Sequence, residues 1–214
     1  SWGLNSSLQI YMNTYFWEFK SIMIASFLGI YAMSTFTAFL LIPRLVLYLE
    51  KRSILLFSIA LAALIPPIPI ILYINDILPD SGSWNLFFSL APFIYIGNTC
   101  LSSSAIVRES MLGDISDEVE LESKIGQQGL MFASSSLIGK LNTGLGILVA
   151  GLALEFIGFP RGSEILPNSD QIFSLAMVQG PFVAVLMIVP FGIFFLYNID
   201  RQKHNTILSQ LDAR

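Results

Sequence analysis

Apolar residues in this sequence come in long blocks rather than in the 3.6-residue rhythm of an amphipathic helix or the 2-residue rhythm of a half-buried strand. A membrane-spanning helix needs roughly 20 mainly apolar residues to cross about 30 Å of hydrocarbon. Five blocks meet this requirement, at residues 21–42, 53–74, 84–106, 130–157 and 172–197. The sequence therefore predicts an all-α integral membrane protein with five complete spans.

The composition supports this fold class. Hydrophobic residues make up 54% of the 214 residues and charged residues only 12%, which is too little polar surface to coat a soluble domain of this size. The net charge of −4 argues against nucleic acid as a partner. The sequence has no zinc-ligand spacing, glycine-rich phosphate loop or hydrolase nucleophile motif, so we expect neither an enzyme nor a bound metal or organic cofactor.

Residues 1–19 are too short to cross a bilayer alone and mix aromatic side chains with amides such as Asn5, Gln9 and Asn13. We interpret this segment as the end of a truncated sixth span, and a helix lying at the membrane interface is the alternative. The predicted organisation is a truncated helix at 1–19, five spans within 20–198, and a tail at 199–214. Three prolines at positions 66, 67 and 69 predict a kink or local unwinding in the second complete span.

Basic residues predict the orientation, because lysine and arginine concentrate in cytoplasmic connections. One set of connections holds only Lys20 and Arg161. The other set holds Arg44, Lys51, Arg52, Arg108, Lys124, Arg201, Lys203 and Arg214. The second set, and with it the C-terminus, is therefore predicted to be cytoplasmic.

Lys140 is the residue that most suggests a function. It lies about ten residues, or roughly 15 Å, inside the span at 130–157, which is farther than a lysine side chain can reach to water. An ammonium near the bilayer centre costs about 2.5–3.5 kcal/mol, and charges at such depth are usually functional. The alternative is a lysine that only bonds helix carbonyls and stabilises packing.

The chain offers Lys140 no carboxylate at the same depth. All 15 acidic residues lie in connections, in the tail or near the ends of spans. A buried ammonium needs a countercharge to remain charged. We expect the countercharge from a segment absent from this chain, a second chain, a ligand or an ion.

Small and polar residues at helical spacing predict a cavity around Lys140. Ser136 and Thr143 share its helix face, and two further stripes on other spans contain Tyr31 and Thr35, and Tyr95 and Asn98. Instead of lining a cavity, the polar residues of each of these two stripes can form hydrogen bonds to a neighbouring helix.

The segment from Ser110 to Gly146 resembles the region joining the tenth and eleventh helices of the glycoside-pentoside-hexuronide cation symporters, a major-facilitator subgroup that includes melibiose permease. The resemblance rests on an acidic connection followed by a glycine-led helix with a lysine. The resemblance extends beyond this segment to nearly the whole chain. The positions that match are Asp114, Asp117, Glu118, Glu120, Gly129, Lys140, Gly144 and Gly146.

The resemblance implies the C-terminal six-helix half of a bacterial inner-membrane transporter, with five full spans and part of a sixth. Lys140 matches the family lysine linked to cation and substrate coupling. The solute would be glycoside-like, the coupling ion Na⁺ or H⁺, and the main cation site would lie in the missing N-terminal half. Two halves would rock around a midplane site, controlled by cytoplasmic gating loops that carry Arg44, Lys51, Arg52, Asp114, Asp117, Glu118 and Glu120.

The second functional hypothesis is a membrane scaffold or assembly domain that retains the transporter fold without transporting. Loss of gradient-driven uptake in a Lys140→Ala variant would distinguish a symporter from such a scaffold.

Overall fold

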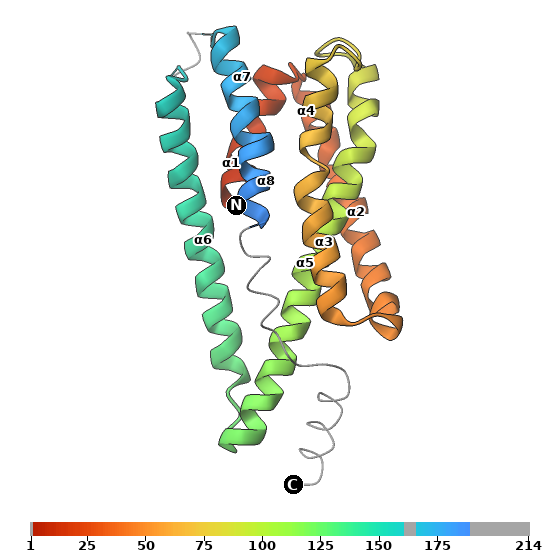
Figure 1. Cartoon of the computed structure of the whole chain (residues 1–214), viewed down its shortest axis with the longest axis vertical. Helices are drawn as coiled ribbons and strands as arrows, with labels where there is room; N and C mark the ends of the chain where they lie inside the picture. The colour runs from red at the N-terminus through yellow and green to blue at the C-terminus, as the bar shows by residue number, and fades with distance from the viewer. Residues whose placement is uncertain (1, 161–165, 189–214) are drawn as a thin grey trace.

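The computed structural model describes residues 2–160 and 166–188, and every regular element in these ranges is a helix (Figure 1). Five helical segments are long and apolar enough to span a membrane, which confirms the predicted five spans. They are Ser21–Tyr48, Lys51–Ile74, Trp84–Ser123, Gln128–Ile157 and Ser169–Leu186. Some predictions lie outside the described residues. They concern the tail at 199–214 with its basic residues, Arg161, and the last part of the fifth span.

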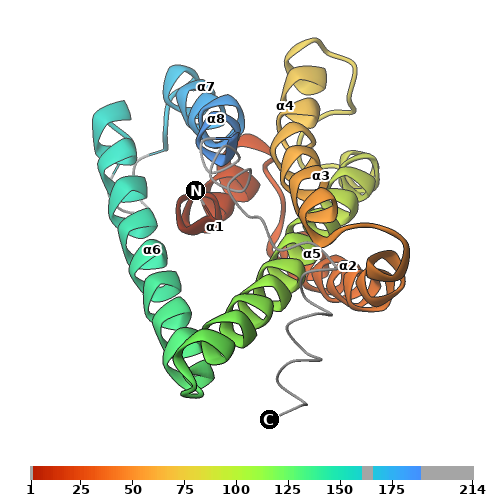
Figure 2. The same ribbon diagram turned by 60° about the horizontal axis from the view of Figure 1, so that its bottom comes forward.

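The chain begins with helix α1 (Trp2–Tyr11), which continues into a π-helical turn, η1 (Met12–Phe16). Leu4, Leu8, Met12 and Phe16 are buried, and their four-residue spacing places them on one face. Helix α1 packs along α6 (Gln128–Ile157), and Figure 2 shows it near α8 (Val183–Ile188) as well. The predicted truncated span at 1–19 is therefore packed among the other helices in this structure.

Helices α2 (Ser21–Tyr48) and α3 (Lys51–Leu64) both pack along α5 (Trp84–Ser123). The prediction that Arg44 lies in a connection is wrong, because α2 continues through Pro43 and Arg44 to Tyr48 and only residues 49–50 connect it to α3. A proline removes one backbone donor without ending a helix whose other groups remain satisfied, and membrane helices commonly tolerate it.

The second span is interrupted, as its prolines predicted. Helix α3 ends at Leu64, and α4 (Pro67–Ile74) starts after Ile65 and Pro66. Proline is favoured in the first turn of a helix, where its missing N–H needs no partner, and it disrupts the turn before it. The two helices together cover the length of one span.

Helix α5 corrects a second prediction, since the acidic segment with Asp114, Asp117, Glu118 and Glu120 is helical and not a loop. The helix has 40 residues. At 1.5 Å per residue it is about 60 Å long, twice the hydrocarbon thickness. Its last turns project beyond the α2–α3 connection (Figure 1). Hydropathy detects only the part of a helix in lipid, so the polar extension was missed.

The last span is assembled from α7 (Ser169–Met177), a π-helical turn η2 (Val178–Phe182) and α8. Asn168 caps α7, accepting a hydrogen bond from the Gln171 backbone, while the Gln171 side chain accepts one from the Asn168 N–H. Pro181 lies within η2 and has no N–H to continue the regular α-helical bonding. The irregular turn results from this proline.

The connections alternate between the two ends of the bundle (Figure 1). The α2–α3 and α5–α6 connections lie at one end, where the basic residues of the described chain are concentrated. The η1–α2 and α4–α5 connections lie at the other end, together with the last turn of α6 and the first turn of α7. This alternation is the one that the sequence predicted.

Candidate functional site

A cavity of about 150 Å³ lies inside the bundle, bordered by α1, α2, α3, α4, α5 and η2. Most of its lining is apolar, and two kinds of side chain stand out against that background. The amides are Asn5, Gln9, Asn98 and Gln179, and the aromatic residues are Trp17, Tyr31 and Phe93. An apolar enclosure with a few polar groups is typical of small-molecule sites.

Three of the cavity amides form one hydrogen-bonded cluster. The Gln179 Nε2 donates to Gln9 Oε1 at 2.7 Å and to Asn5 Oδ1 at 3.0 Å. The Gln9 Nε2 in turn donates to Asn13 Oδ1 at 3.2 Å. These contacts join α1 and η1 to η2 in the last span. The cluster was not predicted from the sequence, although the four-residue spacing of Asn5, Gln9 and Asn13 places them on one helix face.

Two predicted stripes meet between α2 and α5. Asn98 Nδ2 donates to Ser34 Oγ at 2.6 Å, and the hydroxyls of Tyr95 and Thr37 lie 2.6 Å apart. Thr35 Oγ1 lies 3.2 Å from the hydroxyl of Ser102 on α5. These bonds connect the two helices.

Of the four predicted site residues in this interface, Tyr31 and Asn98 line the cavity. Thr35 and Tyr95 are not among the cavity-lining residues, and their hydroxyls bond between α2 and α5.

Lys140 lies elsewhere, on an exposed face of α6. It has no hydrogen-bond or ion-pair partner within the described part of the chain, and it does not line the cavity. Ser136 is also exposed, and the half-buried Thr143 donates its hydroxyl to the Gly139 carbonyl at 3.0 Å. The structure therefore does not bring Lys140, Ser136 and Thr143 together with Tyr31 and Asn98.

The predicted charged residues gather at one end of the bundle. Lys51 Nζ lies 2.7 and 2.8 Å from the two oxygens of Asp114, whose side chain is only 8% exposed. This pair joins the first turn of α3 to the extension of α5. Asp117 accepts a hydrogen bond from Gln128 at 3.2 Å, across the α5–α6 connection. Arg44 is exposed, whereas Arg52, Glu118 and Glu120 are half-buried.

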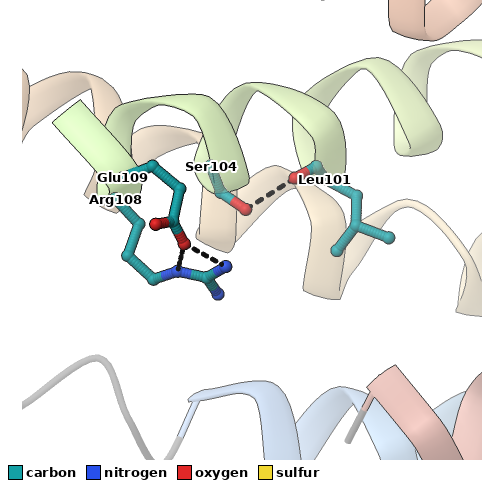
Figure 3. A network of polar contacts seen from close by, with 4 residues as sticks. All are labelled: Leu101, Ser104, Arg108 and Glu109. Carbon is teal, nitrogen blue, oxygen red and sulfur yellow. Dashed lines mark hydrogen bonds and ion pairs between the residues drawn. The ribbon is translucent and has the colours of Figure 1, made fainter. Parts of the chain in front are cut away.

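Figure 3 shows the part of α5 that carries Leu101, Ser104, Arg108 and Glu109. Leu101 lines the cavity, and its carbonyl accepts a hydrogen bond from the Ser104 hydroxyl at 2.7 Å. One turn further, Arg108 and Glu109 form an exposed ion pair at 3.1 Å. Such exposed pairs contribute little to stability, so these residues mark the polar boundary rather than stabilise it.

Comparison with known proteins identifies the family of the chain. Residues 1–201 match the family described as MFS/sugar transport protein. An uncharacterized symporter from Synechocystis sp. is 27% identical over 141 residues, which are 64% of this chain and 25% of that relative. The match thus spans about a quarter of the relative's length. No solved structure matches the chain.

Proposed function

The chain belongs to the MFS/sugar transport protein family, and from this we propose that it forms the C-terminal half of a cation-coupled symporter. The solute is a sugar or a similar small polar molecule, moved by alternating access between the two sides of the membrane. The family match, the five apolar spans and the relative named as a symporter support this function. We further propose a bacterial inner membrane as its location, a cytoplasmic C-terminus on the basis of the distribution of lysine and arginine, and the glycoside-pentoside-hexuronide symporters as its subgroup on the basis of the segment from Ser110 to Gly146.

The position of Lys140 carries the proposal. It lies within the apolar block at 130–157, on an exposed face of α6. An ammonium inside the hydrocarbon core costs about 2.5–3.5 kcal/mol unless a partner compensates it. Because its face of α6 is open, the compensating group comes from outside the described chain: the other half of the transporter, the coupling ion or the solute.

The Lys51–Asp114 pair supplies the second part of the mechanism. Alternating access requires two conformations whose populations change when solute and ion bind. A buried ion pair that joins α3 to α5 stabilises the conformation in which it is formed. We propose that this pair, with the neighbouring charged residues, biases the equilibrium at the cytoplasmic end.

A comparison of lysine variants in the full-length protein tests the coupling role. Lys140→Ala is expected to abolish uptake driven by a Na⁺ or H⁺ gradient, whereas Lys140→Arg keeps the charge and retains part of it. Lys20→Ala removes an exposed lysine at the start of α2 and is the matched control. Uptake of a methyl glycoside into proteoliposomes is the readout. Full uptake by Lys140→Ala would refute the coupling role, and the absence of uptake by every form, wild type included, would favour a scaffold.

A further inference from the structure

Only the nitrogen of the Gln179 amide has hydrogen-bond partners among the described residues. Its Nε2 donates to both α1 amides, but its buried Oε1 has no partner among the described residues. The residue is 8% exposed. A buried acceptor without a donor costs about 1–3 kcal/mol, and native proteins seldom leave such groups unpaired. Because Gln179 lines the cavity, a molecule inside the cavity can provide the missing donor.

The cavity is electrically neutral. None of the described residues that line it is an aspartate, glutamate, lysine, arginine or histidine. An ion placed there would lose its hydration without meeting a countercharge, at a far higher cost than a neutral polar group would incur. Lys140 does not line this space and provides no countercharge to it. The lining therefore favours an uncharged occupant with hydroxyl groups.

The aromatic walls of the cavity suit the ring of a sugar, and its volume of about 150 Å³ admits a small ligand. Trp17 and Phe93 offer flat apolar surfaces to the C–H faces of such a ring. Trp17 is held in place by edge contacts with Phe16 and Tyr73, at ring-centroid distances of 4.6 and 5.2 Å.

Both π-helical turns of the described chain adjoin this space. Met12 begins η1, Gln179 lies in η2, and both line the cavity. Such turns widen a helix locally and are frequent at functional sites. In η2 the wide turn carries Gln179, whose Nε2 donates to two amides of α1, so its Oε1 acceptor is held in place before a ligand enters.

We propose that this cavity is a subsite for an uncharged pyranoside, in which a ligand hydroxyl donates to Gln179 Oε1, and that it rejects sugars bearing a carboxylate. The inference rests on the proposed function and gives it a specificity: neutral glycosides bind and hexuronides do not. The residue that sets this selection is Gln179, supported by Asn5 and Gln9. Lys140 has no direct part in it.

Equilibrium binding to the full-length protein in detergent tests the subsite without a gradient. The probes are tritiated methyl β-D-glucopyranoside and its galacto epimer, with methyl β-D-glucuronide as the competitor. At least one neutral glycoside is expected to bind, and the glucuronide to compete at least about tenfold more weakly. Equal affinity for the glucuronide, or no binding of either neutral glycoside, would overturn the proposal.

Three variants localise the binding. Gln179→Met removes the amide at similar length and is expected to weaken glycoside binding by about fivefold to tenfold. Ala62→Leu fills the cavity from α3, where Ala62 is 4% exposed, and is expected to abolish binding while the protein stays folded. Asn85→Leu, at an exposed amide outside the cavity, should change nothing. Unchanged binding by both cavity variants would refute the assignment.

The binding test of the subsite and the transport test of the symporter can fail independently. Binding that depends on Gln179, without gradient-driven uptake in any form of the protein, would refute the symporter and leave the subsite standing. Coupled uptake together with glycoside binding that is unchanged by substitution of Gln179 and Ala62 would support the symporter and refute the subsite.

Discussion

A methyl group added at Gly146 would collide with the backbone of α1. A Cβ at this position lies 2.6 Å from Leu4 N and 2.7 Å from the Cα and C atoms of Gly3. Non-bonded carbon atoms pack at about 3.5–4.0 Å, so α1 and α6 must separate by about 1 Å to accommodate Gly146→Ala. Neither helix backbone can rotate away as a flexible side chain would.

The change in folding free energy caused by Gly146→Ala follows from two opposing effects. Overpacking costs about 1–3 kcal/mol, and a backbone collision belongs at the upper end of that range. Replacing glycine by alanine inside a helix recovers about 1 kcal/mol. The net loss of folding free energy for Gly146→Ala is therefore about 2 kcal/mol. Gly144 is the matched control, because a Cβ there meets no atom within 4 Å, and Gly144→Ala should be neutral or slightly stabilising.

The assay is thermal unfolding of the purified full-length protein in detergent, followed by helix content and by solubility. Gly146→Ala is expected to unfold several degrees below the wild type and Gly144→Ala at or above it. Equal unfolding temperatures for the two variants would refute the close approach of α1 and α6. That approach also positions the amides of α1, so the stability test bears on the cavity.

Three further predictions concern other parts of the molecule. Lys51→Ala removes the ammonium that lies 2.7 Å from the buried Asp114 carboxylate and should cost about 2–3 kcal/mol, whereas Asp114→Asn in the Lys51→Ala background recovers part of the loss, measured by the same unfolding assay. Tyr95→Phe removes one hydroxyl bond between α2 and α5 and should lower stability by about 1 kcal/mol; an increase in stability would contradict that bond. Single cysteines at Lys124 and Ser81 should react with membrane-impermeant maleimide from the cytoplasmic and the external side respectively, and labelling of both from one side would refute the alternating topology.

The spans were predictable because burial in lipid requires long apolar blocks, and that requirement is visible in any window of the sequence. The break at Pro66 was predictable for the same kind of reason, since a proline lacks the N–H that its helix needs. The limits of the spans were not. Helix α5 extends through residues as polar as Glu118 and Glu120, because glutamate is a good helix former and this extension lies beyond the apolar block.

The candidate site was only partly predictable. Tyr31 and Asn98 were recognised as polar residues at helical spacing, and both line the cavity. Gln179 was not recognised, because a single glutamine in a long apolar block has no local partner. Its hydrogen bonds join it to residues about 170 positions away, with separations of 174 and 170. Only the three-dimensional packing of the last span against α1 shows that it belongs to a cluster.

The measurement that tests the central claim most directly is solute accumulation by proteoliposomes containing the full-length wild-type protein, under an imposed Na⁺ or H⁺ gradient and without one. A symporter built around this half accumulates a neutral methyl glycoside above the external concentration when one of the two gradients is present, and accumulation stops when that gradient is collapsed. Equilibration at the external concentration under both gradients, or no entry at all, would contradict the account.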